Sequence, residues 1–325
     1  MKQAVLKHKN ALFSLLAVLA MAIFALSSET YAAATLDGIK LWAFNIVPSV
    51  FPYFVLTALL TSLGSAARLA SKCSALTKRL FGCGGMSGYA FFIAAVSGYP
   101  AGSKITAELY LKRLVSREDA YKMSGFCAAA SPLFILGTTG AMLLKNRAAG
   151  LAILCAHLFS VLFTAFLLRG KRKTVDDAPP SPPAAGNADN MLYEAVYDSV
   201  ISLLVLGGIV TVYFVLIRML ENCGAFYLPV RLFTLIFGEE TLARGFVYGL
   251  VECTAGVSCA ANSLSTLKIP AVGFLISFGG LSVMTQSLIF LKKAKIKTAR
   301  FFLSKLLHAA FTFIILFFLT LLMPL

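Results

Sequence analysis

Long uncharged runs alternate with short charged segments along almost the whole chain. Most of these runs contain about the 20 apolar residues that a helix needs to cross the hydrocarbon core of a bilayer. We therefore predict an all-α polytopic membrane protein. The runs lie approximately at residues 10–28, 41–67, 80–103, 123–144, 148–168, 199–217, 253–267, 269–291 and 306–325.

Two of these runs lack the pattern of an ordinary spanning helix. The run at 80–103 ends in SGYPAGSKITAEL at 97–109, which places helix breakers and charges at membrane depth. The run at 253–267 is short and rich in Gly, Ser and Thr. Irregular backbone is tolerated inside a membrane only where it is buried in protein or lines a cavity. We predict two re-entrant hairpins, at 83–110 and 243–263, which leaves about seven transmembrane helices.

Composition and charge agree with this interpretation. Of the 325 residues, 59% are hydrophobic and 13% are charged, and the mean hydropathy is +0.84. The net charge of +15 comes from basic clusters between the apolar runs, a pattern that sets membrane orientation and does not indicate nucleic-acid binding. If both hairpins return to their own side, 21 Lys and Arg residues are cytoplasmic and seven are outside. If both segments cross instead, the split is 18 against 10, so the positive-inside rule favours hairpins.

The chain is predicted to divide into four segments. Residues 1–33 form a retained signal-anchor helix, with a cleaved signal peptide as the alternative. A Pro-rich polar linker at 174–190 separates a first repeat at 34–173 from a second, inverted repeat at 191–325. Each repeat is expected to contain a helix, a hairpin and an interrupted helix, in opposite orientations. Inverted repeats with broken helices are typical of secondary transporters, whose binding sites lie near the membrane midplane.

The tip of the first hairpin is the main candidate binding site. Pro100 suits the first turn of a helix, and the free backbone N–H groups that follow it, with the helix dipole, predict an anion site. Lys104 adds a full positive charge, and we expect Lys104→Ala or Gly102→Leu to abolish anion accumulation. The alternative is that Lys104 pairs with Glu108 at i+4. The predicted binding residues here are Ser97, Gly98, Tyr99, Pro100, Gly102, Ser103 and Lys104.

Three further places contribute candidate binding residues. Ser131 and Pro132 interrupt a spanning helix, with a simple kink as the alternative. In the second hairpin, Glu252 lies near Thr254 and is expected to pair with Lys104 or to couple transport to a proton or cation. The alternative for this acid is a place at the outer interface. The second interrupted helix contributes Gly279, Gly280, Ser282 and Gln286.

Other chemistry is not indicated by the sequence. The seven cysteines are scattered without CxxC spacing, the three histidines lack metal-ligand spacing, and no nucleophile or nucleotide-binding motif is present. We expect His157 and His308 to form hydrogen bonds between helices. The sequence predicts no enzyme, no metal and no cofactor.

Four stretches of the chain form a distinctive combination: LDGIKLWAFNIVPSVFPYFV (36–55), SGYPAGSKITAELY (97–110), SREDAYKMSGFCAAASPLFILGTTG (116–140) and SFGGLSV (277–283). Together they resemble the sporulation integral membrane proteins of the YlbJ type, within the wider nucleoside-recognition gate-domain group. The resemblance implies a role in endospore formation and movement of dipicolinate out of the mother cell. Dipicolinate is a small aromatic dicarboxylate, which suits helix N-termini and a lysine.

Two departures from the pattern of that group leave the solute open. Ala130-Ser131 stands where an Asn or Gly is expected beside the small polar residue, and Met284-Thr285 stands where a more polar pair is expected. A transporter of nucleosides or other neutral solutes and a non-transporting spore-envelope assembly protein remain the alternatives. The expected partners are a small-molecule anion and the lipid bilayer, with a homo-oligomer left open. The expected location is the cell membrane, including the outer forespore membrane derived from the mother cell.

Overall fold

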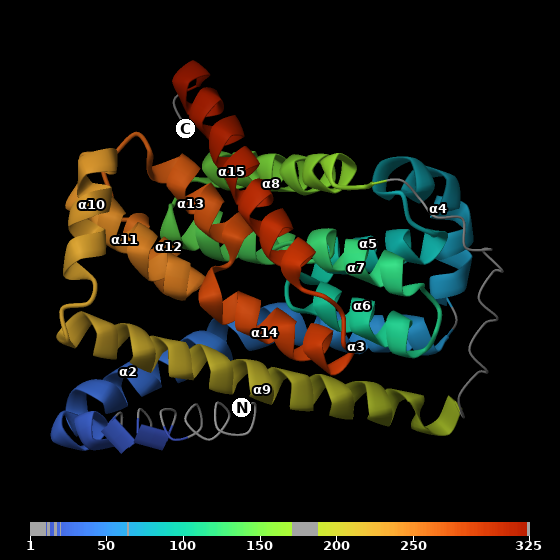
Figure 1. Ribbon diagram of the computed structural model, residues 1–325, viewed down its shortest axis with the longest axis horizontal. Coiled ribbons are helices and arrows are strands. Elements are labelled where there is room, and N and C mark those ends of the chain that lie inside the picture. The colour runs from blue at the N-terminus through green and yellow to red at the C-terminus, as the bar shows by residue number, and fades with distance from the viewer. Residues whose placement is uncertain are drawn as a thin grey trace, which may run out of the picture.

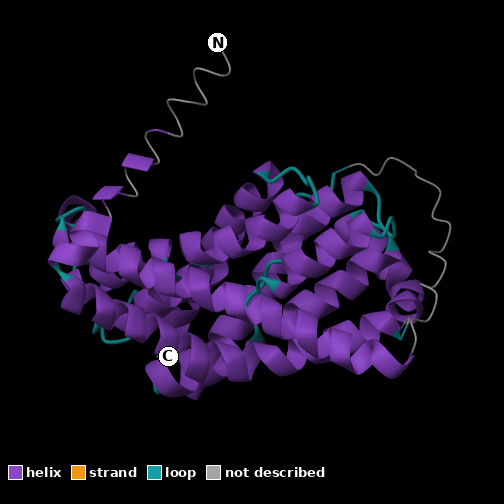
Figure 2. Cartoon of the chain, turned by 90° about the horizontal axis from the view of Figure 1, so that it is seen from below, coloured by secondary structure: helices purple, strands orange, loops and turns teal. Residues whose placement is uncertain are grey.

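A computed structural model describes residues 11, 14–15, 18–19, 21–63, 65–170 and 188–323. Every regular element within these ranges is a helix (Figures 1 and 2). Residues 174–187 of the predicted linker lie outside the described residues. Most of the predicted signal-anchor helix before residue 21 also lies outside them. The all-α prediction is therefore confirmed for the part of the chain that the structure describes.

Four helical segments are long and apolar enough to cross a membrane. The helix α8 (Arg147–Leu167) and the helix α9 (Ala188–Asn222) lie along opposite long sides of the molecule in Figure 1. The other two are the α13–α14 pair (Lys268–Phe278 and Gly280–Lys293) and α15 (Ala299–Leu322). These four correspond to the runs predicted at 148–168, 199–217, 269–291 and 306–325.

Two bent pairs raise the number of candidate spans to six among the described residues, by length and composition. The first is formed by α2 (Ser28–Leu41), η1 (Trp42–Ile46) and α3 (Val47–Ser62), and it bends by 53°. The second is formed by α4 (Ser65–Phe81) and α5 (Gly85–Ser97), and it bends by 82°. The protein is thus a multi-pass helical protein with four to six candidate spans, and seven spans remains a prediction.

The first half contains two consecutive interruptions. The helix α5 is followed by α6 (Ala101–Leu111) after a break at 98–100. After α7 (Arg117–Phe126) the chain is not helical until Pro132, where a helix begins that continues as η2 (Phe134–Leu143). Pro132 therefore does not kink a continuous helix; it is the first residue after the break, where its missing N–H costs nothing.

The second half repeats this order of elements. After α10 (Tyr227–Phe237), the helices α11 (Glu240–Val251) and α12 (Cys253–Ala260) are joined through the single extended residue Glu252. The helix α13 then ends at Gly279, where α14 begins. Both predicted hairpins thus coincide with two short helices joined by a break, and each pair is followed by a broken helix.

A carboxylate clasp holds the loop after α12 to the start of α11. Glu239 accepts hydrogen bonds from the Ser263 hydroxyl and from the backbone N–H groups of Leu264 and Ser265, the latter two at 3.2 and 2.8 Å. These bonds, with the Ser263 hydroxyl first, lower the pKa of Glu239 from its ordinary value of 4.5. A carboxylate with a lowered pKa stabilises the folded state above its ordinary pKa, and this contribution is lost as the pH falls through the lowered value.

We predict that acid opens this clasp. Protection of the Leu264 and Ser265 amides against hydrogen exchange, corrected for intrinsic rates, should fall several-fold between pH 6 and pH 3 because protonated Glu239 is a poorer acceptor. The Gly238 amide, which donates to the Thr234 carbonyl at 2.9 Å, is the internal control and should keep its protection. Equal changes at all three amides would contradict the role given to Glu239.

Candidate functional site

In each half, the hairpin break packs directly on the break of the following helix. Gly98 has a φ of +81°, and a Cβ there would lie 2.7 Å from the Ser131 nitrogen. Gly280 has a φ of +69°, and a Cβ there would lie 3.2 Å from the Val251 carbonyl oxygen and 3.2 Å from the Cys253 nitrogen, on either side of the break at Glu252. Glycine tolerates both the left-handed backbone and the close approach. The same contact between two breaks therefore occurs twice in the chain.

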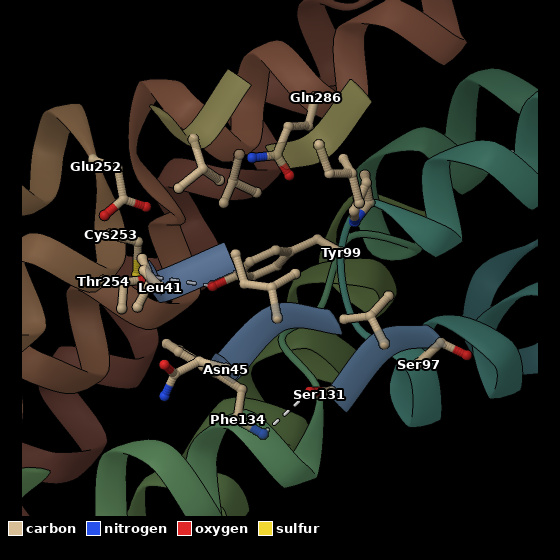
Figure 3. A pocket seen from close by; sticks show the side chains of 16 residues that line it. Leu41, Asn45, Ser97, Tyr99, Ser131, Phe134, Glu252, Cys253, Thr254 and Gln286 are labelled. Atoms are coloured by element: carbon tan, nitrogen blue, oxygen red, sulfur yellow. Dashed lines mark hydrogen bonds between the residues drawn. The ribbon is translucent and has the colours of Figure 1, made fainter. Parts of the chain in front are cut away.

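Tyr99 connects the breaks of the two halves. The Tyr99 hydroxyl lies 3.8 Å from Sγ of Cys253, the first residue of α12. Figure 3 shows the ring extending across the centre of the site, with its oxygen directed at Cys253. The Tyr99–Pro100 peptide bond is cis. The chain breaks of both halves therefore surround one place in the molecule.

A cavity of about 70 Å³ lies where these breaks meet. This volume holds a few water molecules. Its walls come from both halves, and η1 and α9 add Asn45 and Leu206. The predicted binding residues that line it are Ser97, Tyr99, Pro100, Ser131, Glu252, Thr254 and Gln286 (Figure 3).

Glu252 is the acid of this cavity, and its side chain also caps a helix. The residue is 2% exposed, and its carboxylate accepts a hydrogen bond from the Ala255 N–H at 2.7 Å. A carboxylate at a helix N-terminus satisfies a free donor and interacts favourably with the helix dipole. The alternative of an acid at the outer interface does not agree with this burial.

Two other polar side chains of the cavity are held by neighbours in their own helices. Ser131 Oγ accepts a hydrogen bond from the Phe134 N–H at 3.2 Å and so caps the helix that resumes at Pro132. Gln286 Nε2 donates to Ser282 Oγ at 3.2 Å. Gln286 and Ser282 therefore lie on the same face of α14, and the amide oxygen of Gln286 takes no part in this hydrogen bond.

The remaining small residues at the breaks do not line the cavity. A Cβ on Gly102 would lie 2.0 Å from the Cys127 carbonyl oxygen, so Gly102 allows α6 to approach the break after α7. Gly279 ends α13 with a φ of +84°. Ser103 is fully buried, and its hydroxyl has no hydrogen-bond partner among the described residues. Gly98, Gly102, Ser103, Pro132, Gly279, Gly280 and Ser282 are not among the residues that line the cavity.

Lys104 lies in a second pocket and not in the central cavity. Its ammonium group donates to Ser202 Oγ at 3.0 Å and lies 5.4 Å from the centre of the Phe54 ring. Glu108 and Asp198 line the same pocket, but no ion pair joins Lys104 to Glu108 or to Glu252 in the described structure. Both predicted ion pairs are therefore absent there, and a role for Lys104 in binding stays a prediction tied to this second pocket.

Lys305 is a buried cation beside the cavity. It is one of the 21 Lys and Arg residues that the positive-inside rule placed in the cytoplasm. It is 1% exposed, and its ammonium group lies 5.3 Å from the centre of the Tyr99 ring. A signal for it exists in the sequence, because Ser304, Lys305, His308 and Thr312 recur at helical spacing in an otherwise apolar segment. Such a polar stripe indicates a helix face turned toward the protein interior.

The two helical histidines connect the first break to α13 and α15. The Ala130 N–H donates to His157 Nε2 at 2.9 Å, so the imidazole proton is on Nδ1 and points to Ser277 Oγ at 2.8 Å. Ser277 in turn donates to Thr312 Oγ1 at 2.9 Å. His308 Nε2 lies 2.9 Å from the His157 carbonyl oxygen. The prediction that both histidines form hydrogen bonds between helices is confirmed.

Comparison with known proteins supplies one informative relative. The chain is 26% identical to the sporulation integral membrane protein YlbJ of Bacillus subtilis (strain 168) over 307 aligned residues, covering 86% of this chain and 74% of YlbJ. The YlbJ-type resemblance is confirmed. No known family model matches the chain, and no solved structure matches it. The chain is thus similar to an integral membrane protein of sporulation, in agreement with its apolar helices.

Proposed function

We propose that this protein transports a small anionic metabolite across a membrane during endospore formation, and that the metabolite is dipicolinate leaving the mother cell. The observation that carries the proposal is the cavity lined by chain breaks from both halves. Three helices begin beside this cavity, directly after Pro100, directly after Ser131 and at Cys253, and these three residues line it. Their N-terminal ends carry partial positive charge, which favours an anion. No enzymatic activity and no cofactor form part of the proposal.

The repeated packing of the breaks supports an inverted repeat, with 34–173 and 191–325 as its two halves. Broken helices at the interface of two repeats are the usual site of secondary transporters, and rocking of one repeat against the other gives alternating access. The present cavity is far smaller than the roughly 300 Å³ at the lower end of small-molecule pockets. It therefore corresponds to a closed form, and a substrate enters only after the halves move.

A neutral solute is the second candidate, and a specific observation favours it. Apart from Glu252, the polar side chains that line the cavity are uncharged, among them Asn45, Ser131, Thr254 and Gln286. Amide and hydroxyl groups of this kind recognise sugars and bases by hydrogen bonding. A nucleoside would use these groups and would gain little from the helix dipoles.

Direct flux measurement separates the two candidates. Purified protein in proteoliposomes should move labelled dipicolinate well above the rate of protein-free vesicles, and unlabelled dipicolinate should compete at far lower concentration than uridine or adenosine. A protein-dependent flux of nucleoside with no flux of dipicolinate would establish the neutral-solute function instead. Flux of neither solute would contradict both proposals. A fluorescent fusion of the active protein should mark the outer forespore membrane in sporulating cells.

A further inference from the structure

We propose that Lys305 is the cation that binds a carboxylate of the transported anion, and that Tyr99 covers it in the closed form seen here. This inference rests on the proposed function and names the residue that gives the site its selectivity for charge. It differs from the expectation drawn from the sequence, which gave this part to Lys104.

The charge of Lys305 is buried without a counter-charge. Its ammonium group donates one hydrogen bond, to the Ala128 carbonyl oxygen at 3.0 Å. Within the described ranges no carboxylate forms an ion pair with it, and its other N–H groups have no hydrogen-bond partner. A buried ammonium group without a carboxylate partner is costly inside a membrane protein and marks a functional site by default.

Lys122, the other buried lysine among the described residues, does not share this situation. Lys122 is 3% exposed and also donates to a backbone carbonyl, that of Gly82 at 3.1 Å, but it forms an ion pair with Glu118 at 3.2 Å. Lys122 therefore has the counter-charge that a structural lysine needs. The contrast indicates that the counter-charge of Lys305 is supplied by a bound anion and not by a carboxylate of the described chain.

Tyr99 is the side chain shared by Lys305 and the cavity. Its ring lines the cavity, and the Lys305 ammonium group lies 5.3 Å from the ring centre, a cation–π distance. The hydroxyl of Tyr99 holds the ring toward Cys253 of the second half. A movement that separates the halves at this contact frees the ring and opens the ammonium group to a ligand in the cavity.

The backbone around Lys305 fits the same role. Ala128 lies in the non-helical segment after α7, so its carbonyl is available to Lys305 because no helical N–H uses it. A carboxylate of the substrate would meet Lys305 on one side of Tyr99, and the helix N-terminus capped by Ser131 lies on the wall of the same cavity. A planar dicarboxylate has acidic groups at both ends and can use both positions at once.

Selectivity for charge is the property that tests this assignment. Binding of dipicolinate and of its neutral analogue pyridine-2,6-dicarboxamide should be measured by calorimetry on the full chain in detergent. We expect the wild-type protein to prefer the dicarboxylate by roughly 30-fold or more, the loss seen when one partner of a buried charge pair is removed. In Lys305→Gln this preference should collapse to near unity, and in Lys305→Arg most of it should remain.

Two matched variants make the result specific. Lys122→Gln, which also removes a buried lysine, should keep the wild-type preference. If Lys104→Gln loses the preference for the dicarboxylate while Lys305→Gln keeps it, the assignment is overturned in favour of Lys104. If Lys305→Gln does not fold, Lys305→Met removes the charge at similar volume. An unchanged preference in a folded Lys305 variant overturns the proposal while the transport function stands; absence of dipicolinate binding in the wild type overturns both.

Discussion

Gly256→Val should leave almost no folded protein. A Cβ at this position would lie 2.1 Å from the Gly249 Cα and 2.2 Å from the Gly249 nitrogen. Both contacts are with backbone atoms of α11, which cannot rotate away as a side chain can. We expect a loss of stability of about 3 kcal/mol or more, at the upper end for overpacked sites, because α12 can no longer lie against α11.

The measurement is the yield of monodisperse protein in detergent, together with its thermal midpoint. Gly208→Val is the control, because Gly208 lies within α9 and a Cβ there meets nothing within 4 Å. Both variants introduce the same β-branched side chain into a helix, so a difference between them reports the hairpin contact. Similar yields and midpoints for the two variants would contradict the described packing of α11 and α12.

Glu252→Gln should stop a pH gradient from driving accumulation of the anion. The Glu252 carboxyl group lines the cavity in which we place a dicarboxylate, and two carboxylates that share a buried site do not both remain ionised. Binding of the anion therefore brings a proton to the site, and glutamine cannot carry it. Its amide oxygen can still accept the hydrogen bond of the Ala255 N–H, so the cap of α12 is kept.

Accumulation in proteoliposomes under an imposed pH gradient measures this coupling. One pH unit corresponds to about a tenfold change in the accumulation ratio for each coupled proton, and the Glu252→Gln variant should lose that response while it still exchanges dipicolinate down its gradient. Glu240→Gln is the control, because the Glu240 side chain is 64% exposed and pairs with Arg244 at the surface. If Glu252→Gln follows the pH gradient like the wild type, Glu252 is excluded as the coupling group.

The breaks of the fold could be predicted from the sequence because they depend on local chemistry. Gly98 and Pro100 end one helix and begin another whatever surrounds them, and Ser131-Pro132 is a cap followed by a first-turn proline. Glu252 could be found as an acid between apolar residues. These signals located seven of the 16 residues that line the cavity without knowledge of the tertiary structure.

The side-chain partners could not be predicted in the same way. Lys104 and Glu108 have the spacing of a helical ion pair, but Ser202 of α9 takes the ammonium group instead, and that helix is remote in sequence. Lys305 follows a basic cluster, so its position in the chain indicated a surface residue. Its burial depends on α15 crossing the break after α7, a contact between segments 177 residues apart.

The hydrogen-bonded chain through His157 has a mechanical consequence. It ties the broken segment at Ala130 to Ser277 on α13 and to Thr312 on α15, so one point of the first half is fastened to the second half by buried polar contacts. Tyr99 joins the halves through a single long contact to sulfur, which is a weaker connection. Opening of the cavity is therefore expected to begin with loss of the Tyr99–Cys253 contact, while the hydrogen bonds of His157 to both halves are kept.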